Sequence, residues 1–320
     1  MNNLEQIRAN VSRRQIINTA FGIIGLLIIL VSIFILLALV IDMAIDGAER
    51  LRPEFFTSFP SRRPTRAGIL SAWVGTSLVM LVTTVATIPL GVAAGIYLEE
   101  YARKNWLSAL IEINVTNLAG VPSIVYGLLA LGLFVYEFNL GESVLSAGLT
   151  LTLLILPVVI VTTREAIRAI PNSLREAAYA VGASKWQTIW DHTLPYSFGS
   201  ILTGIIIGLS RAIGETAPVI TIGALTFIAF LPDSPFKSEF PYISFAWLQA
   251  PFTVMPIQMF NWVSRPDIEF QKNAAAAGVV LIAMTLVMNG IAIYLRYRFR
   301  KNLNGRTKSR TRIQSYGNRA

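Results

Sequence analysis

Six long apolar stretches constrain this chain more than any other feature of its sequence. Each is long enough to cross the hydrocarbon core of a bilayer, which takes about 20 residues of helix. The chain of 320 residues is 54% hydrophobic and only 14% charged, and its mean hydropathy of +0.58 argues against a soluble design. The sequence therefore predicts an all-α membrane protein with six transmembrane helices. They cover Thr19 to Ile41, Ala67 to Leu98, Ile113 to Tyr136, Ser143 to Thr163, Thr193 to Leu231 and Asn273 to Leu295.

The basic residues predict the orientation of these helices, because cytoplasmic segments of membrane proteins hold an excess of Lys and Arg. With the N-terminus inside, most of the 27 basic residues fall in cytoplasmic segments, including the run that starts at Arg296. The arginines from Arg50 to Arg66 oppose this assignment but are fewer. We therefore expect both termini in the cytoplasm. The net charge of +9 then reflects topology and attraction to anionic membrane lipid, and no nucleic-acid partner is expected.

The sequence contains no recognisable catalytic or nucleotide-binding motif. Neither Gly-x-x-x-x-Gly-Lys-Ser/Thr nor Gly-x-Gly-x-x-Gly occurs, so no loop that cradles the phosphates of ATP is encoded. Cysteine is absent, and the single His192, which we expect at the surface, forms no triad or metal-ligand cluster with the scattered carboxylates. We therefore expect no catalytic residue, no metal site and no cofactor bound by this chain.

The predicted cytoplasmic loop between the fourth and fifth stretches contains a short helix. Ser173 and Glu176 have the spacing of a capping box, in which each side chain satisfies a free backbone amide at a helix start. Gly182 can supply the left-handed residue that ends the helix. The residues at i, i+3, i+4 and i+7 form one narrow apolar face of mostly small side chains, namely Leu174, Ala177, Ala178 and Val181.

A second short helix follows after a sharp turn. Ser184 and Gln187 form another capping box, and we expect this helix to end before Pro195. A face of small side chains on an exposed helix suits docking into a groove of another protein. The alternative is that the alanines pack back on the ends of the membrane helices.

This loop resembles the EAA loop of ATP-binding-cassette (ABC) importer permeases. The resemblance rests on Glu176-Ala177-Ala178-x-x-x-Gly182, followed by Leu194-Pro195; the family has an aliphatic residue where this chain has His192. In that family the loop is a coupling helix that sits in a cleft of the ATP-hydrolysing subunit. The resemblance therefore implies that Glu176, Ala177, Ala178 and Gly182 couple this chain to an ATPase.

Further motifs extend the resemblance from about Ala67 to Arg300 and narrow it to phosphate importer permeases. It implies the type I ABC importer (MetI-like) permease fold, with residues 67–300 as the permease domain and 164–196 as its cytoplasmic coupling loop. Residues 1–66 would hold the first helix and an outside loop, and residues 301–320 a basic cytoplasmic tail. The motifs are Ala67-Gly68-Ile69, Pro89-x-Gly91, Ile96-Tyr97-Leu98-Glu99-Glu100-Tyr101-Ala102, Gly120 to Gly127, and Arg211-Ala212-Ile213-Gly214-Glu215-Thr216-Ala217-Pro218.

The resemblance also implies the partners of the chain. They are a companion six-helix permease subunit, an ATPase dimer that hydrolyses ATP, and an extracytoplasmic phosphate-binding protein, assembled in a bacterial or archaeal plasma (inner) membrane. No internal repeat is evident in the sequence, so the chain is expected to supply one half of the route for phosphate.

Arg211 and Glu215 are the only charged residues within the six apolar stretches. A charge at the bilayer centre costs about 2.5–3.5 kcal/mol on insertion scales, so such residues usually face protein or a water-filled route. They are four apart on one helix face, and Pro218 interrupts the helix beside Glu215. We expect Arg211 to attract the anion, and Glu215 to position Arg211 or accept a proton from the substrate. The alternative is an ion pair that only fixes helix packing.

The remaining polar or irregular positions have more structural interpretations. The segment from Gly120 to Gly127 predicts a kinked, closely packed span, although Ser123 could face the route. Asn289 in the last stretch is expected to make an interhelical hydrogen bond. The aromatic and proline-rich loop from Pro232 to Lys272 predicts short interfacial helices outside the membrane.

Two other functions remain open on the sequence alone. One is a permease of the same class for another oxyanion, such as molybdate or sulfate. The other is an ion-coupled secondary transporter or channel that needs no ATPase, which would leave the coupling-loop motif without a role.

Overall fold

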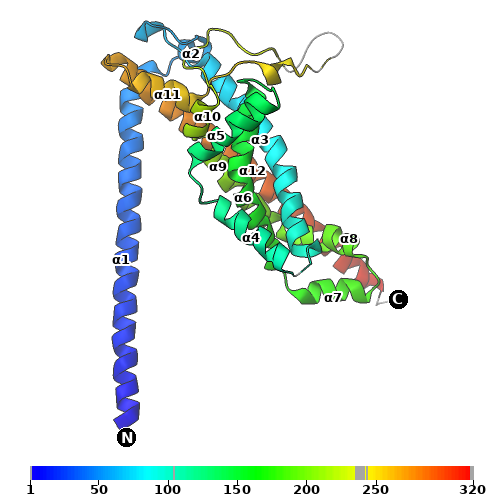
Figure 1. Ribbon diagram of the computed structural model, residues 1–320. Coiled ribbons are helices and arrows are strands. Elements are labelled where there is room, and N and C mark those ends of the chain that lie inside the picture. Colours follow the sequence, from blue (N-terminus) through cyan, green and yellow to red (C-terminus); the bar gives the residue numbers. More distant parts are fainter. Residues whose placement is uncertain (1, 104, 235–241, 243, 318–320) are drawn as a thin grey trace.

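The computed structural model is a helical bundle with a separate N-terminal helix (Figure 1). It describes residues 2–103, 105–234, 242 and 244–317, and every regular element in these ranges is a helix. Five helices there are long and apolar enough to cross a membrane. Their full extents are α1 (Asn2–Gly47), α3 (Leu70–Ile96), α6 (Val144–Arg168), α8 (Lys185–Thr188) continued by η5 (Ile189–Thr193) and α9 (Leu194–Ala212), and α12 (Ile268–Gly317).

The third predicted span is a pair of helices with a sharp bend. α4 (Trp106–Leu118) and α5 (Ser123–Ala130), which η4 (Leu131–Glu137) extends, meet at 106°. Pro122 precedes α5 and lacks the amide that would continue the ladder from α4. Across the break, the Tyr126 hydroxyl donates a hydrogen bond of 2.7 Å to the carbonyl of Leu118. The described residues thus contain six candidate spans, α1 included, if this broken pair counts as one.

Helices α3, α6 and α9 form the centre of the bundle. Small residues let their backbones approach closely. Gly91 of α3 lies against Val159 of α6, and Gly204 of α9 lies against Thr162 of α6, with no room for a side chain on either glycine. Backbone proximity therefore sets the spacing of these three helices.

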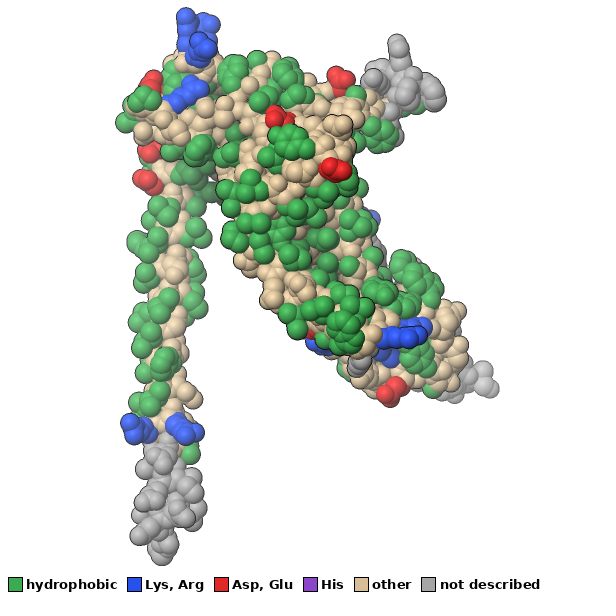
Figure 2. Space-filling model, viewed as in Figure 1, with side chains coloured by type: hydrophobic (Ala, Val, Ile, Leu, Met, Phe, Trp, Pro, Cys, Tyr) green, Lys and Arg blue, Asp and Glu red, His purple; other side chains and the backbone are tan. Residues whose placement is uncertain are grey.

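Helix α1 stands apart from the bundle over most of its length (Figure 1). In its most apolar window of 18 residues, none is buried, and apolar side chains line the face seen in Figure 2. Near its C-terminal end it contacts α12, where Gly47 lies against the backbone of Ala276 and Met43 lies against Gly278. Most of α1 is thus left for lipid or another subunit to cover.

Short helices gather at the end of the bundle opposite α7 (Asn172–Ala180), as Figure 1 shows. The loop from Pro232 to Lys272 contains the short helices that the sequence predicted, and α11 buries one of its faces in the bundle while Phe260 and Val263 stay exposed. Its Trp262, Met255 and Ile257 are fully buried among other side chains of the chain. These elements are η1 (Ala48–Arg50), α2 (Pro53–Thr57), η2 (Pro64–Arg66), η6 (Ala246–Gln249) and α11 (Met255–Val263).

The fifth predicted span differs from the expectation at both ends. The helix that opens at Lys185 does not end before Pro195 but continues to Ala212. The wider π-turn of η5 directly precedes Pro195, whose missing amide it accommodates. At the other end the helix stops at Ala212, and α10 (Ala217–Thr221) follows a short turn. The interruption predicted beside Glu215 is therefore confirmed.

Candidate functional site

The first part of the site is α7, which lies across one end of the bundle (Figure 1). Its start differs from the prediction, because Pro171 is the N-cap and the helix has no side-chain cap. Ser173 is already inside the first turn and cannot act as N-cap for Glu176. The capping box predicted at Ser184 is present: its hydroxyl accepts from the Gln187 amide, and the Gln187 side chain accepts from the Ser184 amide.

The end of α7 follows the prediction. Gly182 has φ +87°, in the left-handed region, as expected of a glycine C-cap. The amide of Ala183 donates to the carbonyl of Ala178 at 3.1 Å, and the amide of Gly182 donates to that of Tyr179 at 2.9 Å. This pair of bonds is the Schellman motif, which satisfies the last carbonyls of the helix and turns the chain sharply.

The predicted apolar face of α7 is divided between two directions. Ala178 is 5% exposed and packs toward the bundle, as the alternative interpretation held for these alanines. Glu176 and Ala177 are exposed, and Val181 is 84% exposed. Within the described part of the chain, the Glu176 side chain has no hydrogen bond or ion pair. The outer face of α7 is therefore free for a partner.

Two tryptophans extend this exposed region beyond α7. Trp186 and Trp190 are more than half exposed and stack on each other with ring centroids 5.6 Å apart. His192, in the same helical stretch, is exposed, as expected. The aromatic pair is one turn apart on one helix face, so the sequence spacing alone could have indicated it.

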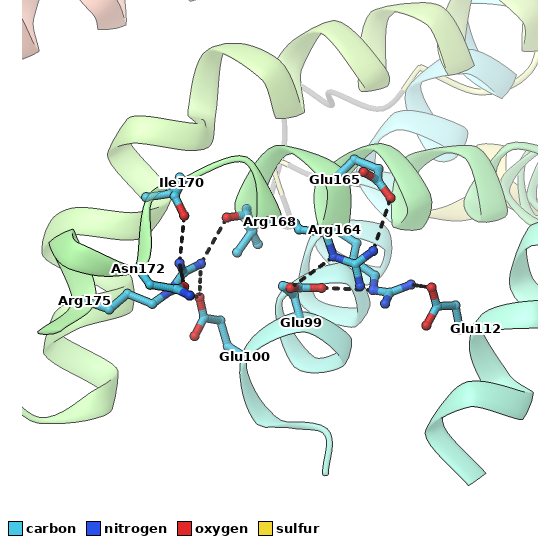
Figure 3. A network of polar contacts seen from close by, with 10 residues as sticks. Glu99, Glu100, Glu112, Arg164, Glu165, Arg168, Ile170, Asn172 and Arg175 are labelled. Atoms are coloured by element: carbon cyan, nitrogen blue, oxygen red, sulfur yellow. Dashed lines mark hydrogen bonds and ion pairs between the residues drawn. The ribbon is translucent and has the colours of Figure 1, made fainter. Parts of the chain in front are cut away.

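A network of ion pairs joins the α7 end of three spans (Figure 3). Glu99 lies in η3 (Tyr97–Tyr101), the π-helical continuation of α3. The Nε atoms of Arg164 and Arg168 on α6 approach its carboxylate at 3.0 Å and 3.4 Å. Arg164 also pairs with Glu112 of α4. The network thus ties α3, α4 and α6 together where they leave the bundle.

Arg175 links α7 itself to this end of the bundle. Its Nη2 and Nε atoms lie 2.9 Å and 3.0 Å from one carboxylate oxygen of Glu100. Its Nη2 donates to the carbonyl of Ile167, and its Nη1 donates to that of Ile170, both at 3.0 Å. The Glu100 side chain is 7% exposed and that of Arg175 14%. Nη1 also donates to the Asn172 side chain at 3.2 Å.

Glu99 and Glu100 belong to a motif that carries the family resemblance, but no contact of theirs was predicted from the sequence. One signal was available: Arg164, Arg168 and Arg175 are spaced by four and seven residues and follow a span, while paired glutamates end another. Opposite charges at the ends of two neighbouring spans on the same side of a membrane attract each other, so ion pairs between them could have been expected.

The second part of the site is the break between α9 and α10. The Arg211 Nε lies 3.2 Å from the Glu215 Oε1, so the predicted ion pair is present. The Arg211 side chain is 41% exposed and that of Glu215 17%. Glu215 lines a small internal space that Thr76 and Met80 of α3 also border. Arg211 is thus the more exposed member of the pair, and Glu215 is the more buried one.

Ser123 lies on a helix that packs directly against this break. Its helix α5 contacts α10 so closely that Gly127 has no room for a side chain beside Pro218 and Thr221. The close packing expected of the segment from Gly120 to Gly127 is confirmed here. Ser123 itself is half-buried and makes no hydrogen bond to Arg211 or Glu215 among the described residues. The structure brings the two helices together, but not these three side chains.

Asn289 makes the interhelical hydrogen bond that the sequence predicted. The Ser210 hydroxyl donates to its side-chain oxygen at 2.8 Å, which joins α9 to α12 one residue before Arg211. Among the described residues, no cluster of His, Asp and Glu could hold a metal ion.

Comparison with known proteins places this geometry among transport components. The family model described as "Binding-protein-dependent transport system inner membrane component" matches residues 87–303. The phosphate transport system permease protein PstA of Yersinia pestis is 33% identical over 84% of this chain and 86% of its own length. The probable ABC transporter permease protein YqgI of Bacillus subtilis is 31% identical over 89% of this chain and 96% of its own length.

Solved structures with a similar fold include a bacterial alginate ABC transporter in complex with an alginate-bound periplasmic protein. The match has a TM-score of 0.58 at 14% identity, and it covers 82% of this chain and 88% of the other. At this identity the likeness concerns the fold alone, and it agrees with the MetI-like permease fold expected from the sequence.

Proposed function

The chain belongs to the family of binding-protein-dependent transport system inner membrane components, and we propose that it is the permease subunit of an ATP-driven phosphate importer. In this proposal the chain forms half of the route across the membrane and binds no nucleotide or other cofactor. The name of the Yersinia pestis relative and its coverage of both chains support phosphate as the substrate.

The observation that carries the proposal is the exposed Arg211 at the break between α9 and α10. An arginine that is 41% exposed at membrane depth needs either a protein partner or an aqueous route beside it. Its guanidinium can donate charge-assisted hydrogen bonds to a phosphate oxygen. In our proposal Arg211 binds the anion, Glu215 holds the guanidinium in place or accepts the substrate's proton, and Ser123 lines the route nearby.

A companion permease subunit would cover the surface around Arg211. Apolar side chains on the neighbouring helices are largely exposed in the single chain, among them Ile207 of α9, Ile220 of α10 and Leu128 of α5. Such a surface beside a charged residue suits a subunit interface that encloses a polar route. This arrangement supports a route shared by two subunits.

The outer face of α7 is the proposed contact for an ATPase dimer. In this proposal Glu176 and Ala177 contact the ATPase. Ala178 packs toward the bundle, and Gly182 ends the helix and turns the chain sharply. In this orientation the α7 end and both termini face the cytoplasm. A phosphate-binding protein would then deliver substrate at the opposite end, at the plasma (inner) membrane's outer surface.

Reconstitution tests the proposal directly. The chain would be co-purified with a companion permease and ATPase and placed in proteoliposomes with a phosphate-binding protein. We expect uptake of labelled phosphate that requires ATP, and excess sulfate or molybdate should compete poorly. Strong competition by either oxyanion would assign a different substrate, and uptake by the chain alone without nucleotide would contradict the coupling to an ATPase.

A further inference from the structure

The contacts of Arg175 suggest more than an anchor for one helix. Its guanidinium joins three elements: α7, on which it lies; α6, through the carbonyl of Ile167; and η3 at the end of α3, through Glu100. The Ile170 carbonyl in the α6–α7 connection is a further acceptor. A planar guanidinium can satisfy several acceptors in a fixed geometry, which the ammonium of lysine cannot do.

Burial makes the connection between Arg175 and Glu100 rigid. With 7% of the Glu100 side chain and 14% of the Arg175 side chain exposed, the pair is poorly screened by solvent and cannot separate without leaving a buried charge unpaired. The pair between Arg168 and Glu165, at the end of α6, differs from it. The two side chains are 49% and 61% exposed, and the atoms lie 3.8 Å apart. An exposed pair of that kind contributes little to rigidity.

Helix α3 connects the contacts of Arg175 to the proposed substrate site. Glu100 follows α3 directly at its α7 end, and Thr76, near the other end of the same helix, borders the internal space that Glu215 lines. α3 also packs along α6, whose last turn supplies the Ile167 carbonyl. A displacement of α7 that is transmitted through Arg175 therefore acts on α3 and α6, two of the helices that border the space beside Glu215.

We propose that Arg175 is a positioning residue that makes α7 move as one body with α3 and α6, so that ATP hydrolysis by a partner is converted into opening of the phosphate route. This inference rests on the proposed function, since it assigns the mechanical connection within that transporter. Glu100, at the end of the α3 span, is the ion-pair partner of Arg175 in this connection.

The test measures the coupling ratio, the number of phosphate ions transported per ATP hydrolysed, in proteoliposomes of the complete complex. Arg175→Met keeps the side-chain volume but removes the hydrogen-bonding fork. We expect the assembled variant to hydrolyse ATP with a coupling ratio lowered about fivefold or more, the lower bound of typical coupling free energies. A purely structural role would lower the yield of complex, but not this ratio.

Arg103→Met is the matched control, because Arg103 follows η3 at the same end of the bundle, is exposed and has no ion pair among the described residues. Its coupling ratio should equal that of the wild type. Glu100→Gln provides a second variant that removes only the charge, and it decides the matter if Arg175→Met fails to assemble. The double variant should be no worse than the worse single variant, since the same connection is lost in each.

An assembled Arg175→Met or Glu100→Gln complex with the wild-type coupling ratio would overturn the inference. Failure of the proposed function gives a different result, because the wild-type complex itself would then show no ATP-dependent phosphate uptake. The two failures are therefore distinguishable in one series of measurements.

Discussion

Arg211 and Glu215 form an ion pair of 3.2 Å across the point at which α9 ends, and the arginine side chain is the more exposed of the two. Arg211 lies in the last turn of α9, and Glu215 lies in the short turn (213–216) that separates α9 from α10. The pair therefore does not stiffen a continuous helix, and its two charges differ in exposure.

Replacing Arg211 by Gln should lower phosphate uptake by about tenfold or more, because a charge-assisted hydrogen bond contributes about 1.5–3 kcal/mol. Uptake into proteoliposomes at equal amounts of assembled complex is the measurement. Arg296→Gln is the control: Arg296 donates to Thr203 between α12 and the same α9, away from the break, so uptake should persist. Undiminished transport by Arg211→Gln would reduce the ion pair to a packing element.

Gly127→Val should destabilise the chain by about 1–3 kcal/mol, the usual cost of overpacking. The added side chain would meet the backbone of Pro218 and the Thr221 side chain. Thermal unfolding of the purified chain in detergent measures the effect. Gly290→Ala on α12, where nothing lies within 4 Å of the added atom, should leave the midpoint unchanged or raise it. Equal midpoints for both variants would mean that α5 and α10 are not in close contact.

Gly182→Ala should loosen the end of α7, because a non-glycine residue in the left-handed region costs about 1–2 kcal/mol. Amide hydrogen exchange at Ala183, whose amide closes the Schellman motif, should become faster in the variant. Gly199→Ala is the comparison, since Gly199 lies within α9 with open space around it. If Ala183 exchanges as slowly as in the wild type, the turn does not depend on glycine.

Ser210→Ala and Asn289→Leu together test the hydrogen bond between α9 and α12. Interhelical hydrogen bonds in membrane proteins average about 0.6 kcal/mol in double-mutant cycles, so we expect a coupling of that size in thermal unfolding. The cycle separates the bond of 2.8 Å from the effects of each side chain alone. Strict additivity of the two substitutions would show that the bond contributes nothing to stability.

The features that could be predicted from the sequence depend on local chemistry. Pro218 lacks an amide wherever it lies, so the interruption beside Glu215 could be foreseen. Gly182 is suited to a left-handed C-cap, and Ser184 and Gln187 have the spacing of a capping box; all are present in the structure. Apolar length located five of the six spans as helices, because the bilayer fixes how long a crossing helix must be, but it did not show the 106° bend in the third or the ends of the fifth.

The features that could not be predicted depend on distant partners or on competing local solutions. Glu100 and Arg175 are 75 residues apart in sequence, and only packing of α3 beside α6 brings them together. Pro195 was expected to end a helix, yet a π-turn before it offers another way to accommodate the missing amide. The capping box predicted at Ser173 is absent, because the helix begins earlier, with Pro171 as its N-cap.

The isolation of α1 has a consequence for how the family can evolve. Because its apolar window is unburied by the rest of the chain, the fold of the bundle exerts almost no selection on the identity of those side chains. Substitutions among Leu, Ile, Val and Phe in this helix should accumulate freely unless another protein packs against these side chains. If the residues along one face of α1 are substituted slowly among relatives, that face is the contact surface for another protein. If all faces are substituted at the same rate, the helix is surrounded by lipid.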